Sequence, residues 1–223
     1  VLSHLLGHEG PNSSFAILQN KGWLSSLSAG PRTSAPDFQL FQIDMSLTES
    51  GEQHWKDVIE IIFQHCRLIA DAVKAAQDGS KELHRIWGET ATLNAMFFHQ
   101  TSPGSVYGLA PTLSNNIVAY GTEESMSKGS MLKENEDTLP LTDLIDFVKR
   151  LVPSNCLIER CSETAWEEVS QGANELRKEQ WYGIEYFVSP VVEEDIRRWT
   201  AATPSDLALP KENNYIPRTL DLC

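Results

Sequence analysis

The fold class follows from FQLFQIDMSL, residues 38–47, and the segment directly after it, TESGEQHWKDVIEIIFQHCRLIADAVKAAQDG, residues 48–79. From Phe41 to Leu47 of the first segment apolar and polar side chains alternate, which predicts an antiparallel strand with one face in water. In the second, apolar residues recur about every 3.6 positions after Thr48, which predicts a capped helix that packs on the sheet and ends at Asp78-Gly79. The pattern indicates an α+β fold with an antiparallel sheet packed against a layer of helices.

The residues before this segment predict the partner strand. Trp23–Ala29 reads as a strand, and residues 30–37 hold one glycine and two prolines, so we expect a hairpin joined by a long turn. Further upstream, Gly10-Pro11 followed by an apolar face predicts a short helix over about 11–21.

The residues after the helix continue the α+β pattern. We expect helices over 80–100, after Pro103, from Thr142 to Pro153 and over 193–199, strands over 156–159 and 181–188, and an extended tail over 209–223. Residues 121–138 and 162–179 are polar and are predicted to be insertions or mobile loops. Residues 1–223 are interpreted as one domain that lacks its first strand, and the open sheet edge this would leave favours self-association into a homodimer.

Charge and hydropathy exclude two classes of partner. The chain has 18 Lys and Arg against 31 Asp and Glu, a formal net charge of -13, which repels phosphate backbones and anionic lipid headgroups. No segment approaches the roughly 18 apolar residues of a membrane helix. We therefore expect neither nucleic acid nor a membrane as partner.

The cysteines and the first residues indicate a piece of an intracellular protein. Four cysteines lie far apart and form no CxxC pair, which favours a reducing, cytoplasmic location over a disulfide framework. The CxxxxC spacing of Cys156 and Cys161 lacks the second pair of a structural zinc site. The chain begins at Val1 without an initiator Met, as a fragment of a longer chain would.

His4, His8 and Glu9 form the one cluster that resembles a metal site. Two histidines four residues apart share a helix face, as zinc ligands often do. Gly7 and Gly10-Pro11 disfavour a helix that continues through the cluster, and neither HExxH nor HxxEH occurs. The alternative is that these side chains cap the helix near Pro11, where Glu9 would complement its positive end.

Other catalytic patterns are missing from the sequence. There is no GxSxG elbow and no glycine-rich phosphate loop. His65-Cys66 lies within the apolar periodicity of the long helix, so Cys66 is predicted to be a core residue. We predict no catalytic residue and no metal ligand in this chain.

Several motifs resemble those of the insulinase (pitrilysin-type) zinc metallopeptidases, and insulin-degrading enzymes in particular. They are SHLLGHEGP at residues 3–11, KGW at 21–23, LSAG at 27–30, DMSLT at 44–48, EQWYG at 179–183, IRRW at 196–199, and LPKEN with YIP at 209–217. The resemblance spans nearly the whole chain and is weakest in its middle.

The resemblance implies a role without catalysis for this part of such an enzyme. In that family four related α+β domains enclose a chamber, and zinc binds an HxxEH motif in the first domain. This chain resembles the second domain, so the zinc and the Arg and Tyr that assist catalysis would belong to other parts of the polypeptide. Its partners would be peptide substrates and the other domains of the same polypeptide.

The family's second domain holds the amino-terminal residues of the substrate at an exosite. Carried over by motif, the resemblance implies substrate-binding roles for His4, Gly7, Glu9, Leu27, Ser28 and Ala29. An edge strand offers unpaired N–H and C=O groups to any extended peptide, and the Glu9 carboxylate suits an α-ammonium group. Ser3, Asn12 and Ser28 depart from the family pattern, which puts the turn shape and the peptide preference in question. The alternative is a noncatalytic scaffold domain of the same fold, like processing-peptidase or core-protein subunits.

Overall fold

The computed structural model describes residues 1–34, 38–100, 102, 104–127, 139–171 and 175–217. They fall into two compact units. The hairpin unit comprises residues 2–70 and 146–209, and the α5 unit comprises Val1, residues 71–145 and the chain from Pro210 onward. Whether the two units fold together as one domain depends on their folding cooperativity. The assignment of residues 1–223 to a single domain therefore stays a prediction.

The hairpin unit is built on two antiparallel strands, β1 (Leu24–Ser34) and β2 (Gln39–Leu47). The predicted hairpin is confirmed, but β1 runs further than expected: Gly30 and Pro31 pair with Gln42 and Phe41 instead of opening the turn. The register shifts just after Pro31. Proline donates no ladder hydrogen bond and is tolerated on a strand with one unpaired edge. Within the described residues β1 is such a strand, because it pairs only with β2.

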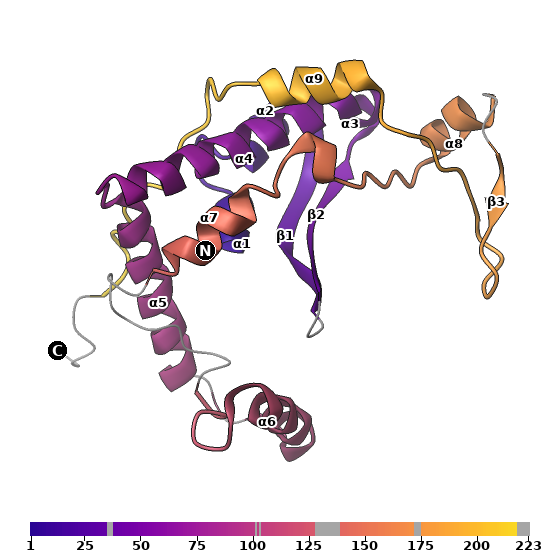
Figure 1. The fold of residues 1–223 in the computed structure, drawn as a ribbon. Helices are drawn as coiled ribbons and strands as arrows, with labels where there is room; N and C mark the ends of the chain where they lie inside the picture. The colour runs from indigo at the N-terminus through magenta and orange to yellow at the C-terminus, as the bar shows by residue number, and fades with distance from the viewer. Residues whose placement is uncertain (35–37, 101, 103, 128–138, 172–174, 218–223) are drawn as a thin grey trace. The chain divides into compact units, whose positions relative to one another are not determined.

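Two short helices precede the hairpin and contact β1 (Figure 1). They are α1 (Leu2–Leu6) and α2 (Ser14–Asn20). The expected helix over 11–21 starts late because Asn12 has a left-handed φ of 64°, and Ser13 is the N-cap that accepts a hydrogen bond from the Ala16 N–H. Ser13 therefore takes the capping role predicted for the histidines and Glu9, and the complement of the helix end by the Glu9 charge stays a prediction.

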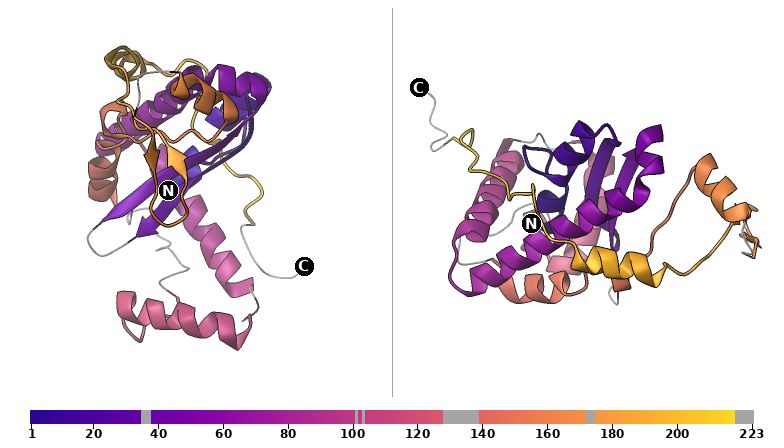
Figure 2. Two further views of the ribbon diagram at one scale, coloured as in Figure 1. Left: turned by 90° about the vertical axis from the view of Figure 1, so that its right-hand side faces the viewer. Right: turned by 90° about the horizontal axis from the view of Figure 1, so that it is seen from above.

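The segment after the hairpin forms two helices where the sequence predicts one. Thr48 caps α3 (Glu49–Gln53) as predicted by accepting the Gly51 N–H, and the chain then breaks at His54 before α4 (Trp55–Gln77). One stripe of α4 is buried, with Val58, Ile62, Cys66, Ile69 and Val73. Figure 2 shows the first part of α4 running across the hairpin, as the α+β prediction requires.

The rest of the hairpin unit contains η2 (Pro153–Asn155), α8 (Glu163–Ser170), β3 (Arg177–Lys178), β4 (Glu185–Tyr186) and α9 (Glu193–Ala201). The predicted α9 is confirmed. Residues 156–159 form no strand, and Leu157 is 92% exposed, so nothing buries the side chain that suggested one. The polar segment 162–179 contains α8, so that part is not a loop. Residues 128–138 and 172–174 of the two predicted insertions lie outside the described residues.

Buried aromatic packing fixes α9 on the start of α4. The Trp199 ring is 2% exposed, lies 6.1 Å from the ring of Phe63 and 6.4 Å from that of Trp55, and its indole N–H donates to the Lys56 carbonyl at 3.1 Å. Lys56 and Asp195 form an ion pair at 2.6 Å beside it. The late chain therefore returns to complete the core of the hairpin unit.

A buried histidine joins α2 to α4. His65 is 1% exposed, its Nδ1 lies 2.9 Å from Ser14 Oγ, and burial, with a smaller contribution from His8, lowers its pKa from 6.5 to about 4. His65 binds a proton near pH 6.5 in the unfolded chain but only near pH 4 in the folded chain. The free energy of unfolding therefore decreases as the pH falls from about 6.5 to about 4. We expect a loss on the order of 3 kcal/mol, measured by urea unfolding.

Two variants test this assignment. His65→Gln is expected to flatten the pH dependence, because no group at this position titrates. His99→Gln, at the exposed end of α5, should leave it as in the parent chain. A His65→Gln variant with unchanged pH dependence would assign the effect to another group.

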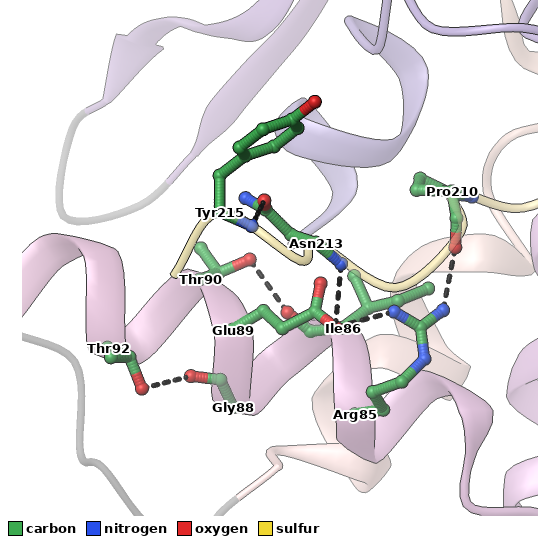
Figure 3. A network of polar contacts seen from close by, with 9 residues as sticks. All are labelled: Arg85, Ile86, Gly88, Glu89, Thr90, Thr92, Pro210, Asn213 and Tyr215. Carbon is green, nitrogen blue, oxygen red and sulfur yellow. Dashed lines mark hydrogen bonds and ion pairs between the residues drawn. The ribbon is translucent and has the colours of Figure 1, made fainter. Parts of the chain in front are cut away.

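The α5 unit contains α5 (Glu82–Gln100) and α6 (Val106–Tyr120), and α7 (Leu141–Val148) begins in it. These helices match the predicted ones. Residues 210–217 form no helix, as expected for an extended tail, and a polar network holds them on α5 (Figure 3). Arg85 donates to Glu89 at 2.7 Å and to the Pro210 carbonyl at 2.6 Å, while the Asn213 N–H donates to Glu89 Oε1 at 3.4 Å.

Arg85→Ala is expected to release the tail while α5 stays folded. The variant loses both charge-assisted donations, so we expect a loss of about 1–2 kcal/mol in local stability and a roughly tenfold faster exchange of the Asn213 amide. Lys149→Ala is the control, because it removes only an exposed ion pair with Asp146. Unchanged Asn213 exchange in Arg85→Ala would show that the network does not hold the tail.

Candidate functional site

The turn after α1 brings two of the predicted site residues together. The Gly7 N–H bonds the Ser3 carbonyl at 2.9 Å and ends the helix, and a Cβ placed on Gly7 would lie 3.7 Å from the backbone nitrogen of Ala29. A Cβ on Gly30 would in turn lie 3.6 Å from Ser3 Oγ. Glycine at position 7 therefore lets the turn approach the β1 backbone closely.

Leu27, Ser28 and Ala29 differ in what they offer. Leu27 is 7% exposed and belongs to the core, Ser28 is exposed and Ala29 is half-buried. They pair with Met45, Asp44 and Ile43 of β2 on one side. Within the described residues no third strand pairs with the other edge of β1, although α1 contacts the strand beside Ala29 and Gly30. The available rim is thus the backbone of this edge, with the Ser28 side chain in water.

Glu9 and His4 are both exposed. Glu9 follows the turn. Burial lowers the pKa of His8, and the negative charge of Glu9 partly opposes this shift. The His4 and His8 rings lie 6.0 Å apart and are tilted by 51°. The turn therefore presents one carboxylate to solvent two residues after the glycine that lies beside β1.

The described residues offer no metal centre. In that part of the chain no three His, Cys, Asp or Glu side chains are placed to hold a metal ion. Cys156 and Cys161 are exposed free thiols, and Cys66 is buried as predicted. His4 on α1 and His8 and Glu9 after it are therefore not placed as a set of three that could hold a metal ion.

Sequence reasoning missed two residues of this site. Ser3 entered it only as a departure from a family pattern, yet its Oγ lies beside Gly30 and its carbonyl ends α1 at Gly7. Asp44 lies opposite Ser28 on the exposed face of the hairpin, where the Gln42 amide donates to it. The alternation in residues 38–47 already placed Asp44 on the polar face, so this residue could have been found; the Ser3 contact required the tertiary fold.

A second concavity in the hairpin unit competes as a binding site. It has a volume of about 390 Å³ and is lined by Glu52, Trp55, Lys56, Asp57, Arg160 and Arg198, among others. The Arg160 guanidinium stacks 4.4 Å from the Trp55 ring and pairs with Glu52 at 2.7 Å and Glu168 at 2.8 Å. Arg198 pairs with Asp57 and Glu60, and Lys56 with Asp195. Because each cation here has a carboxylate partner, the charges hold α8 and α9 on α3 and α4 and offer little to a charged ligand.

Comparisons with known proteins agree over almost the whole chain. The model for the middle or third domain of peptidase M16 matches residues 98–223, and the model for the peptidase M16 inactive domain matches residues 1–77. Insulin-degrading enzyme of Homo sapiens is 30% identical over 223 residues, which cover 99% of this chain and 20% of that protein. A nardilysin-like protein of Arabidopsis thaliana is 31% identical over 223 residues, covering 97% of this chain and 20% of that protein.

The fold has a relative of known structure. The crystal structure of pitrilysin matches 98% of this chain and 21% of that chain, with a TM-score of 0.77 and 17% sequence identity. The chain thus spans about a fifth of the length of the relatives that it matches.

Proposed function

Because this chain belongs to the peptidase M16 family, we propose that it is a noncatalytic, substrate-binding part of a zinc metalloendopeptidase that degrades small peptides. In this proposal the rim of β1 at Leu27–Ala29, Gly7, His4 and Glu9 form an exosite for the amino end of a peptide. The observation that carries it is the placement of Gly7 beside the Ala29 backbone on a strand edge that no described strand covers.

The proposed chemistry is recognition by main-chain pairing. Backbone N–H and C=O groups along β1 would pair with an extended peptide whatever its side chains, and the Glu9 carboxylate would bind the α-ammonium group. Holding one end of the peptide fixes which bond reaches a distant metal centre. Since no group of described residues fits zinc, hydrolysis would take place on another part of the enzyme, where zinc would activate water.

Several properties support the proposed setting. The described cysteines are free thiols, which suits a reducing, cytoplasmic location. No helix in the described part of the chain is long and apolar enough to cross a membrane. The net charge of -13 favours basic or neutral peptides over nucleic acid as partners, and the open edge of β1 suits pairing with a peptide or with a second copy.

Calorimetry with one short peptide in two forms tests the exosite. We expect the peptide with a free amino terminus to bind about tenfold or more tightly than its acetylated form, because only the ammonium group forms a charged hydrogen bond with Glu9. Glu9→Gln should remove the difference, whereas Gln19→Leu, on the exposed face of α2, should retain it. Equal affinities in the parent chain would remove Glu9 from this role and favour a scaffold function.

The chain alone should not cleave peptide when zinc is added, and chelator-sensitive cleavage would contradict the noncatalytic assignment.

A further inference from the structure

The β3–β4 hairpin carries an exposed group of large apolar side chains. Trp181, Tyr182 and Ile184 are 82%, 88% and 61% exposed, and we call these three residues the aromatic tip. They stand between β3 and β4, which pair through Arg177 with Tyr186 and Lys178 with Glu185. Single exposed apolar residues are common on protein surfaces, but three large ones within four positions of one short hairpin loop favour an interaction site.

The backbone of the aromatic tip is held in one shape. The Glu179 carboxylate accepts the N–H groups of Trp181 at 2.7 Å and Tyr182 at 2.6 Å, and these bonds hold the pKa of Glu179 below its ordinary value. The Glu179 N–H donates to the Ile184 carbonyl at 2.8 Å and closes the loop. Gly183 adopts a left-handed φ of 69°, which other residues rarely do. The two aromatic rings are therefore presented on an ordered turn.

The base of the hairpin is anchored to a helix. The Phe187 ring, next to β4, lies 5.0 Å from the ring of Trp166 on α8. Arg160, just before α8, pairs with Glu52, and Ser162, the N-cap of α8, donates to the same carboxylate at 2.7 Å. A chain of packed and charged contacts thus leads from α3 to the hairpin, which makes the tip a defined projection of the hairpin unit.

An ordered tip with two exposed aromatic rings suits a folded partner that has a pocket for them. Each ring buries roughly 150–250 Å² when covered, and a pre-ordered loop binds with less entropic cost than a flexible one. A flexible peptide has no ready-made pocket for such a projection, whereas a folded module does. The relatives of this chain are about five times its length, so most of such a polypeptide lies outside these 223 residues.

We propose that the aromatic tip inserts into an apolar pocket on another folded module of the same, longer polypeptide. The proposal shares with the proposed function the idea that this chain works as one part of a larger enzyme, but it does not depend on the exosite. The aromatic tip would fix the orientation of the hairpin unit through Trp181 and Tyr182, and Ile184 would complete the apolar contact.

Residue-resolved hydroxyl-radical oxidation of the natural polypeptide, purified from its source, tests the contact. In the native protein Trp181 and Tyr182 are expected to be oxidised about tenfold or more slowly than after unfolding in urea, as for anchor residues in a desolvated pocket. Equal rates in the two states would overturn the proposal, including the case where the natural polypeptide is no longer than this chain. Protection that disappears on dilution would also overturn it, because the partner would then be a second copy.

A double variant separates docking from local folding. Trp181→Ala with Tyr182→Ala, made in the same polypeptide, should speed proteolytic cleavage around the hairpin unit while the circular dichroism of the protein is retained. Leu157→Ala is the matched control, because Leu157 is 92% exposed and lies outside the hairpin. A double variant that resists proteolysis as well as the control would contradict the proposal. Neither outcome alters the affinity for free or acetylated peptides. The docking contact can therefore be contradicted while the exosite stands, and the reverse also holds.

Discussion

Gly51→Ala is expected to lower the free energy of unfolding by more than about 3 kcal/mol. A Cβ on residue 51 would lie 1.9 Å from the Trp23 carbonyl oxygen and 2.8 Å from its carbon. Both are backbone atoms, and the same oxygen already accepts the Thr48 N–H at 3.0 Å, so it has little freedom to move. Alanine gains up to about 1 kcal/mol in helix propensity, far less than this clash costs.

Urea unfolding of the chain measures the effect. Gly108→Ala in α6 is the matched control, because its new Cβ would meet only Ser105 Oγ, at 3.4 Å, and it should be neutral or slightly stabilising. If Gly51→Ala and Gly108→Ala unfold at the same urea concentration, the close approach of α3 to the start of β1 is wrong. That approach sets where β1 begins, and with it the position of the proposed rim.

Gly7→Leu is expected to weaken peptide binding about tenfold or more. Its side chain would press on the Ala29 backbone, because the Cβ alone would lie 3.7 Å from the Ala29 nitrogen. The Cβ would also lie 2.8 Å from the Ser3 carbonyl oxygen, so the end of α1 must shift. Both effects act on the rim and leave the Glu9 side chain chemically intact.

Calorimetry with the free-terminus peptide measures the loss, and circular dichroism checks that the variant is folded. Gln19→Leu supplies the control, since it adds an apolar side chain at an exposed position of α2. Wild-type affinity in a folded Gly7→Leu chain would mean that peptide binds elsewhere.

The two strands of the β1–β2 hairpin and the longer helices were predictable because local pattern and tertiary role agree in them. Alternation in residues 38–47 produced β2, and the apolar spacing after Thr48 produced the buried stripe of α4. The family resemblance is confirmed over nearly the whole chain, although the matches divide it between two family models where the motifs pointed to one domain.

The differences come from contacts between segments distant in sequence. The break at His54 accompanies stacking of its ring on Trp23, 4.5 Å away, which periodicity does not encode. Helix α8 was hidden in polar composition, although Ser162 caps it and Ala165 is buried. The strand expected over 181–188 is reduced to β4, because Glu179 and Gly183 close a turn within it.

The candidate site was predictable only in part. Motifs supplied its residues, but the physical reason for Gly7, the close approach of the turn to the Ala29 backbone, appears only in the fold. The burial of Leu27 limits that residue to its backbone, and the contact of Ser3 with Gly30 has no signal in the sequence.

Nuclear Overhauser contacts between this chain and a bound short peptide test the central claim most directly. We expect contacts from the first residues of the peptide to the backbone of Leu27, Ser28 and Ala29, in the pattern of an added β-strand, with the amino terminus close to Glu9. Contacts that instead gather at the concavity of Trp55 and Arg160, with none to β1, would contradict it.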